Sequence, residues 1–122
     1  MKAFRTRRGQ KGFTLIELLM VIAIIGILMT IALPQFTAYR LRGYNTAARS
    51  DARNAYTAAQ AYYNDHAGGI IASTADLAVF GFQPTANVDT TATGAISALA
   101  ITSSHASGSI TYSVNSAGVI TP

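Results

Sequence analysis

The feature that most constrains the fold is an apolar run at residues 18–33, which only Gly26 and Thr30 interrupt. Counted from Phe13, this segment would form a helix about 31 Å long at ~1.5 Å per residue. That length matches the ~30 Å hydrocarbon core of a bilayer. We therefore expect residues 13–34 to form a helix that either crosses a membrane or lies at the centre of an apolar bundle.

Positive charge gathers in front of the apolar run. Five of the nine cationic side chains precede Gly12, whereas residues 13–122 carry four arginines and five carboxylates. The formal net charge of +4 therefore belongs to the first twelve residues, and net charge does not support a general nucleic-acid surface. The same asymmetry predicts that the N-terminal end stays in the cytoplasm and that the rest of the chain lies outside.

A secretory signal peptide would also place basic residues before an apolar stretch. The stretch here is too long for one, and Pro34-Gln35-Phe36 follows it without a convincing small-x-small cleavage site. We therefore expect the apolar helix to remain in the working protein.

Residues 35–66 keep a helical period but change from apolar to amphipathic. One stripe recurs at spacings of three and four residues: Tyr44, Ala48, Ala52, Ala55, Ala59, Tyr62 and His66. Most of its members are alanines, so the packing partner approaches closely. Gly68-Gly69 then ends the helix. Residues 13–66 are predicted to form one helix, roughly 80 Å long by the rise per residue.

Residues 67–122 are rich in Ser, Thr, Gly and Ala, with short alternating β-branched runs. Strands are predicted at residues 99–104, 110–115 and 119–121, with a fourth at 87–91 and turns at Ser107-Gly108 and Ser116-Ala117-Gly118. Residues 69–83 are expected to be a linker loop, with one helical turn capped by Ser73 or Thr74 before Asp76. The predicted fold is α+β, with a three- or four-stranded antiparallel sheet whose apolar face covers the alanine stripe.

No catalytic, cofactor or metal-binding pattern stands out. The chain has no cysteine, His66 and His105 lack metal-ligand spacing, and no serine lies in a nucleophile elbow. The aspartates lack calcium-loop spacing, and Asp51, Asp65, Asp76 and Asp89 are each expected to lie on the solvated surface. Phe36 and the tyrosines at 39, 44, 56, 62 and 63 are interpreted as packing and sheet-anchoring residues. We expect no enzyme, no cofactor and no metal site.

The most informative stretch is Lys11-Gly12-Phe13-Thr14-Leu15-Ile16-Glu17. Glu17 places a single carboxylate at the start of the apolar helix, where a charge is costly. Two interpretations remain open on physical grounds. The carboxylate either sits near lipid headgroups and interacts with the helix dipole, or it is the buried partner of a positive group on a neighbouring subunit.

This stretch, with the apolar run, Gly26 and Pro34, resembles the N-terminal signature of type IV pilins and their pseudopilin relatives. The resemblance covers roughly residues 8–63. It implies a class III-type leader, residues 1–12, removed between Gly12 and Phe13 by a prepilin peptidase, and N-methylation of Phe13. It further implies a pilin fold: filament-core helix 13–34, amphipathic half 35–66, and linker and sheet 67–122.

The same resemblance assigns assembly roles to Glu17, Gly26 and Pro34. Glu17 would neutralise the Phe13 amine of an adjacent subunit, and the helix between Gly26 and Pro34 would lose its helical form in the filament. A simple kink at Pro34 is the alternative for that segment.

The function implied is a type IV pilus subunit, a single-pass inner-membrane protein that polymerises into an extracellular helical homopolymer. Its partners would be other copies, the assembly platform and motor, and the outer-membrane secretin. The alternative is a pseudopilin of a type II secretion system, or a minor or competence pilin. Nucleic acid would contact the arginines at 40, 42, 49 and 53, but pairing of these side chains with Asp51 or Asp65 is favoured. The chain lacks the two cysteines of many major pilins, and the sequence does not decide between motility, adhesion, DNA uptake and secretion.

Overall fold

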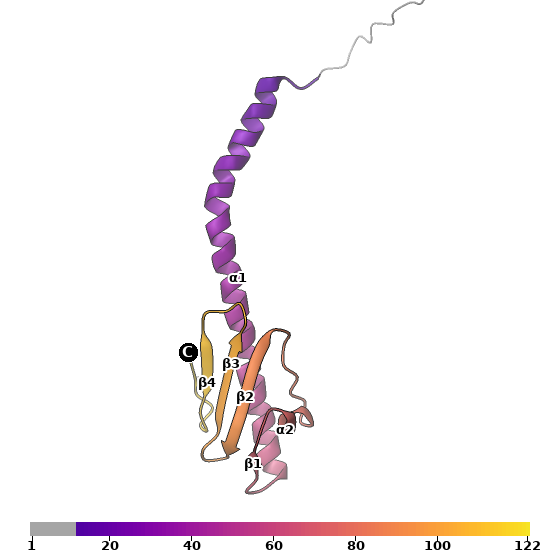
Figure 1. Cartoon of the computed structure of the whole chain (residues 1–122), viewed down its shortest axis with the longest axis vertical. Helices are drawn as coiled ribbons and strands as arrows, with labels where there is room; N and C mark the ends of the chain where they lie inside the picture. Colours follow the sequence, from indigo (N-terminus) through magenta and orange to yellow (C-terminus); the bar gives the residue numbers. More distant parts are fainter. Residues whose placement is uncertain (1–11) are drawn as a thin grey trace, which may run out of the picture. The chain divides into compact units, whose positions relative to one another are not determined.

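The structure is a computed structural model that describes residues 12–122 (Figure 1). Residues 1–11, which belong to the predicted leader at residues 1–12, lie outside the described residues. The chain divides into two compact units, Met1–Phe36 and Thr37–Pro122, which are described separately. One helix, α1 (Leu15–Asp65), contributes to both units.

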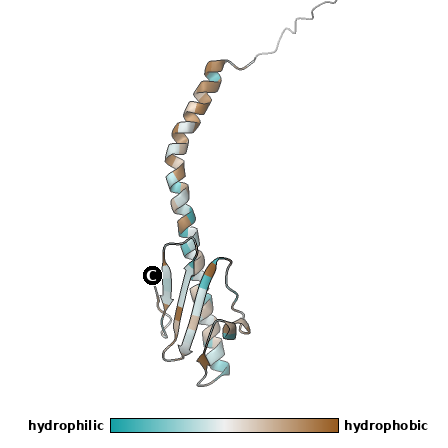
Figure 2. Ribbon diagram, viewed as in Figure 1, coloured by the Kyte–Doolittle hydropathy of each residue, from teal (hydrophilic) through white to brown (hydrophobic). Residues whose placement is uncertain are grey.

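The first unit contains the apolar part of α1. The helix begins at Leu15, two residues later than predicted, and continues through Pro34 without interruption. Its large apolar side chains are exposed all round, from Leu15 at 76% to Leu33 at 55%. Figure 2 shows this segment as a mostly hydrophobic ribbon. A helix that is apolar on every side requires lipid or other apolar helices around it.

In the second unit, the remaining part of α1 buries one face of small residues. Ala48, Ala52, Ala55 and Ala59 are completely buried, as the stripe predicted. The stripe is shifted at its C-terminal end, where Tyr63 is buried, Tyr62 is half-buried and His66 is exposed. The helix ends at Asp65, and the following turn places Gly68 at φ +77°, a left-handed conformation that glycine adopts without strain.

The sheet has five antiparallel strands, so the expected three or four strands was an underestimate. The strands lie in chain order: β1 (Ile70–Ile71), β2 (Val88–Ala95), β3 (Ala100–His105), β4 (Thr111–Val114) and β5 (Ile120–Thr121). β1 falls inside the segment predicted to be a linker loop, where it pairs with the end of β2. Its two residues are too few to show an alternating pattern.

The segment between β1 and β2 contains one short helix, α2 (Ala75–Ala78), as predicted. Thr74 precedes it without a side-chain cap, while the Ser73 hydroxyl accepts a hydrogen bond from the Ala75 amide at 3.3 Å. The Asp76 carboxylate closes the turn by accepting the Ala72 amide at 2.9 Å. α2 directs Leu77, which is fully buried, into the core.

The core lies between α1 and the inner face of the sheet, as predicted. It joins the helix alanines and Tyr63 to residues of β1, α2, β3 and β4, including Ile71, Leu77, Ile101 and Val114. The strands alternate inward and outward residues, so β2 buries Val88, Thr90 and Ala92 in turn. In Figure 1 the strands lie against the lower part of α1.

The outer face of the sheet carries a row of hydroxyls across four strands. Thr91 pairs with Thr102, Thr102 with Ser113, and Ser113 with Thr121. The Thr91 and Thr102 hydroxyl oxygens are 2.6 Å apart. Asp89 is the single Asp, Glu, Lys or Arg in the five strands.

Candidate processing and assembly site

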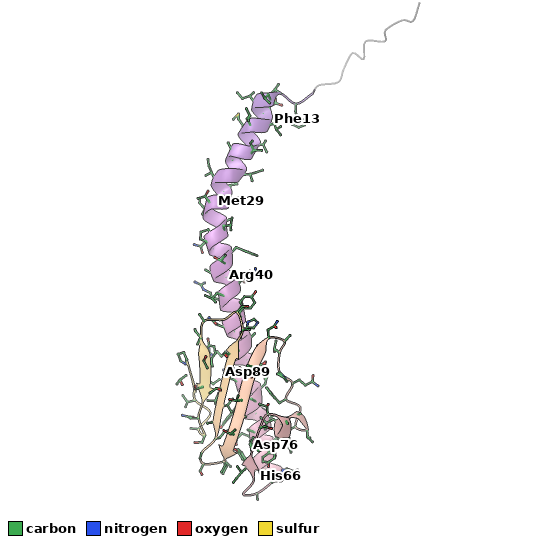
Figure 3. All side chains as sticks on the ribbon, in the orientation of Figure 1. Phe13, Met29, Arg40, His66, Asp76 and Asp89 are labelled. Atoms are coloured by element: carbon green, nitrogen blue, oxygen red, sulfur yellow. The ribbon has the colours of Figure 1, made fainter. Side chains whose placement is uncertain are left out.

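The predicted processing site lies just before α1 begins. Gly12 and Phe13 have no helical or strand conformation, and both are exposed, Phe13 at 90%. A Cβ added to Gly12 would meet no atom within 4 Å. The peptide bond between them is therefore accessible on a single chain. Figure 3 labels Phe13 at this end of the helix.

Thr14 and Glu17 form a reciprocal cap at the start of α1. The Thr14 amide donates to Glu17 Oε2 at 3.2 Å, and the Glu17 amide donates to Thr14 Oγ1 at 3.3 Å. This arrangement satisfies two amides that a helix start leaves without intrahelical partners. It also places a carboxylate in the first turn, where the helix dipole favours negative charge.

The cap gives Glu17 a role within its own chain that the sequence reasoning missed. A signal was present, because Thr14-x-x-Glu17 directly before an apolar run is the pattern of a capping box. Glu17 remains exposed in the single chain. Pairing of Glu17 with the Phe13 amine of another subunit therefore stays a prediction.

Gly26, Thr30 and Pro34 recur at four-residue intervals along the apolar helix. The Thr30 hydroxyl donates to the Gly26 carbonyl at 2.9 Å, a back-bond that weakens helices slightly. Pro34 has no amide hydrogen to donate to the Thr30 carbonyl. A Cβ at Gly26 would meet nothing within 4 Å, so packing within one chain does not require glycine there.

The surroundings of these residues lie outside the single chain. None of the most apolar stretch of α1 is buried in the structure, and α1 is long and apolar enough to cross a membrane. This part of α1 therefore presents apolar surface on every side and carries one carboxylate, Glu17, at its start. In the described residues 12–122, no group of three or more His, Cys, Asp or Glu side chains is placed to hold a metal ion.

In the second unit, polar side chains on α1 hold two loops of the sheet region. Asp51, predicted to be on the surface, is only 2% exposed. Its carboxylate accepts the Thr85 amide and hydroxyl, each at 2.7 Å. Asn45 accepts the Ser109 amide at 2.9 Å, and its own amide donates to the Ser109 hydroxyl at 3.2 Å. The surface assignment of Asp51 was wrong because its partner lies 34 residues further along the chain.

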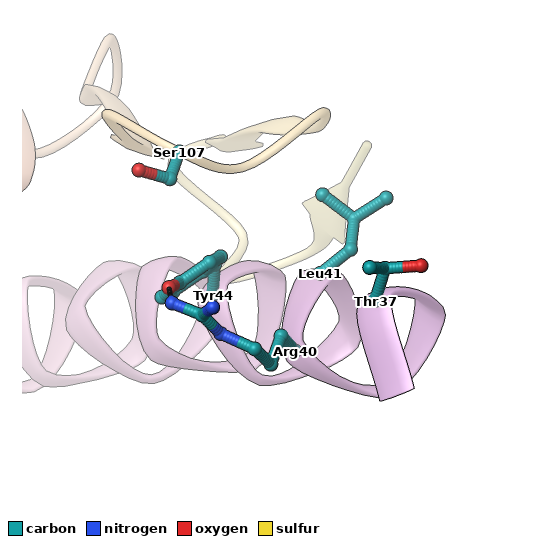
Figure 4. Close-up of a pocket in the computed structure, with 5 residues that line it drawn as sticks. All are labelled: Thr37, Arg40, Leu41, Tyr44 and Ser107. Carbon is teal, nitrogen blue, oxygen red and sulfur yellow. Dashed lines mark hydrogen bonds between the residues drawn. The ribbon is translucent and has the colours of Figure 1, made fainter. Parts of the chain in front are cut away.

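The expected pairing of arginines with Asp51 or Asp65 is also not found. Thr85 occupies the Asp51 carboxylate, and the side chain near Asp65 is that of His66, whose Nδ1 is 3.8 Å from the Asp65 carboxylate. The Arg40 guanidinium instead donates to the Tyr44 hydroxyl at 2.6 Å, within a shallow pocket that Thr37, Leu41 and Ser107 also line (Figure 4). The Tyr44 ring stacks on His105 with centroids 4.4 Å apart.

The tyrosines near the end of α1 anchor the sheet, as interpreted from the sequence. The Tyr63 hydroxyl donates to the Gly94 carbonyl at 2.7 Å, near the end of β2. Burial, and to a lesser extent the neighbouring Tyr62, raises the pKa of Tyr63 above its ordinary value. The Tyr62 ring meets Phe80 edge to face, with centroids 5.8 Å apart.

Comparison with known proteins bears on the N-terminal region first. Residues 7–33 match the family described as the prokaryotic N-terminal methylation motif. The chain is 38% identical over 65 residues to the type IV major pilin protein PilA of Myxococcus xanthus, covering 53% of this chain and 30% of that protein. It is 53% identical over 53 residues to a fimbrial protein of Pseudomonas aeruginosa, covering 43% of this chain and 34% of that protein.

One similarity extends over nearly the whole chain. The fimbrial protein EcpC of Eikenella corrodens is 37% identical over 113 residues, which is 93% of this chain and 68% of EcpC. By contrast, the chain spans about a third of the length of the Myxococcus and Pseudomonas proteins. Since the long helix, the antiparallel sheet and these similarities agree, the chain belongs to the type IV pilin family.

Proposed function

We propose that the chain is the structural subunit of a type IV pilus, without catalytic activity of its own. The observation that carries this proposal is the apolar half of α1, which is exposed on every side. Burying apolar surface is the main favourable term in association. The names of the relatives, which are major pilins and fimbrial proteins, support a fibre rather than a secretion pseudopilin.

Processing would create the assembling form. A prepilin peptidase would cleave between Gly12 and Phe13, the leader residues 1–12 would be lost, and the new Phe13 amine would be methylated. The match to the methylation motif and the exposed, non-helical backbone at this junction support the site. The product would start two residues before the capped end of α1.

Before assembly, the subunit would sit in the inner membrane as a single-pass protein with its N-terminal end in the cytoplasm. The length of the apolar helix and the preceding basic residues support this placement. The pilus assembly platform and motor would then extract it into a helical homopolymer that leaves through an outer-membrane secretin. In the fibre, the apolar halves of many copies would form the core.

Three residues would act in assembly. Glu17 would exchange its capping bond to Thr14 for the Phe13 amine of a neighbouring subunit, since a buried charge persists only when it is paired. Gly26 and Pro34 would bound the part of the helix that loses its regular hydrogen bonds. The Thr30 back-bond and the missing Pro34 donor support this segment as the weakest part of α1.

Intact-mass analysis of sheared surface fibres tests the proposal. The expected mass is that of residues 13–122 with one added methyl group. Gly12→Val should block cleavage, because a branched side chain would meet a protease at an otherwise open backbone position. Gly9→Val is the matched control and should be processed normally. Fibres built from chains that retain the leader would contradict the proposal.

A further inference from the structure

Three arginines share one face of α1 in the second unit. Arg42, Arg49 and Arg53 are all exposed and recur at spacings of seven and four residues. The alanines that pack under the sheet occupy a different face of the same helix. At 3.6 residues per turn the arginine face lies on a flank of the helix, roughly a quarter turn from the alanine face, and its side chains are exposed.

Arg49 and Arg53 line a depression together with Thr46 and Ser50. Its volume is about 280 Å³, slightly below the range of roughly 300–1,000 Å³ that small-molecule sites occupy. All four lining residues come from one helix surface and are polar. Such a depression suits an acidic side chain from another protein surface better than it suits an enclosed small ligand.

The same unit carries one acidic side chain suited to this role. Asp51 is buried on Thr85, Asp76 caps α2, and Asp65 lies beside His66. Asp89 is exposed on β2, where its backbone lies in the ladder with β3, and its side chain makes no hydrogen bond or ion pair within residues 12–122. It is also the single acidic residue on the hydroxyl-rich outer face of the sheet.

We propose that in the fibre the arginine face of one subunit contacts the outer sheet face of a second copy, with Arg49 and Arg53 paired with Asp89 of that copy. The positive charge lies on an exposed flank of α1, and the negative charge lies on the outer face of the sheet. A unit with this arrangement is complementary to itself through two different surfaces. Contacts of that kind generate a filament when the rotation between successive copies does not close into a ring.

This inference rests on the proposed function, because it assigns the contact between subunits that the fibre would repeat. Nucleic acid is the competing occupant of an arginine face, since phosphates also pair with guanidinium groups. The second copy is favoured because its acidic partner lies on the same fold. A fibre also presents that partner at high local concentration.

Cysteine cross-linking tests the contact, because the chain has no cysteine of its own. Cells would express Arg49→Cys and Asp89→Cys subunits together, and purified fibres would be oxidised. Disulfide-linked dimers of the two chains are expected. Arg49→Cys with Thr121→Cys is the matched control, since Thr121 lies on β5, three strands away from β2, and should give no dimer. Intact fibres without the first dimer would overturn the inference and leave the proposed function standing.

Charge reversal supplies a second test in the full-length chain. Asp89→Arg should lower fibre yield several-fold at unchanged subunit level in the membrane, because it opposes two arginines. Combining it with Arg49→Asp and Arg53→Asp should restore most of the yield. Failure of this restoration would contradict the pairing. Normal fibre yield for Arg49→Gln with Arg53→Gln, together with loss of DNA retention by those fibres, would show that nucleic acid occupies the face instead. Absence of the wild-type chain from surface fibres would contradict the proposed function itself.

Discussion

Up to Phe36 α1 exposes all its large apolar side chains, whereas from Thr37 to Asp65 it buries mainly alanines. The two segments are consecutive in one helix, yet they are suited to different surroundings. The first buries none of its large apolar side chains within its own chain, so its surroundings must come from lipid or from other copies. The second is covered by its own sheet, and Asn45 and Asp51 fix the loops that hold the sheet in place. Assembly and folding are therefore separated along the helix.

The largest effect expected is the loss of fibres when the single carboxylate of the apolar segment is removed. Glu17→Ala should leave membrane insertion and leader cleavage intact but strongly reduce fibres, because the Phe13 amine then lacks a partner in an apolar bundle. Sheared-fibre yield against total subunit measures this.

Two companion variants separate pairing from helix capping. Glu17→Gln keeps the shape of the side chain and removes its charge. Thr14→Ala keeps the charge and removes one bond of the cap, which costs typically about 1 kcal/mol. We expect Glu17→Gln to fail in assembly and Thr14→Ala to assemble. Wild-type fibre yield from Glu17→Gln would show that the charge is dispensable.

The next effect concerns the second segment isolated from the first. Deletion of residues 1–35 should leave a soluble, monomeric α/β domain, because its core is internal. In that fragment, Ala55→Glu should cause unfolding, since it places an unpaired charge under the sheet at several kcal/mol. Circular dichroism measures both outcomes. The exposed neighbour Asn54→Glu is the control and should keep its fold. An unfolded parent fragment would mean that the second unit depends on neighbouring subunits.

A smaller effect is expected from Asp51. Asp51→Ala should destabilise the same fragment by about 2–3 kcal/mol, because hydrogen bonds to a charged group contribute roughly this much and Thr85 loses two of them. Urea denaturation measures the difference. Asp65→Ala, at an exposed position, should stay within about 0.5 kcal/mol of the parent. Equal effects of the two variants would contradict the role given to Asp51.

The smallest effect is the loss of the Tyr63 hydroxyl. Tyr63→Phe should cost the fragment about 1 kcal/mol at neutral pH, the usual contribution of one hydrogen bond. Burial holds the pKa of Tyr63 above its ordinary value, so the folded state retains the proton longer than the unfolded state. The contribution of the Tyr63 hydroxyl to the free energy of unfolding is complete below about pH 10, the ordinary pKa of tyrosine. This contribution is lost as pH rises through the raised pKa of Tyr63. The difference in unfolding free energy between the parent fragment and the Tyr63→Phe fragment should therefore decrease at alkaline pH. A difference in unfolding free energy that does not change with pH would contradict this role of the Tyr63 hydroxyl.

The outline of the fold could be predicted because it depends on local periodicity. The four-residue repeat of alanines and the alternation around Ile101 and Val114 mark the buried faces directly. β1 could not be predicted, because two isoleucines between turns show no period of their own. The environment of Asp51 could not be predicted either, since an aspartate is usually exposed and nothing local identifies Thr85 as its partner.

The residues of the N-terminal site were assigned from a motif, and their roles in processing and assembly stay predictions. Gly12, Phe13, Glu17, Gly26 and Pro34 all stand in a motif with high information content. The two hydrogen bonds between Glu17 and Thr14 could have been predicted from the pattern Thr14-x-x-Glu17, which is that of a capping box. Contacts between copies are absent from any single-chain pattern, because they depend on how separate molecules meet.

The two edges of the sheet are β1 and β5, and each is only two residues long. An edge strand exposes unpaired backbone groups that another chain can extend into a continuous cross-chain sheet. Two residues offer too few such groups to template an incoming strand. The short length of β1 and β5 therefore limits strand addition along these two strands, whereas β1 covers only Gly94 and Ala95 of β2.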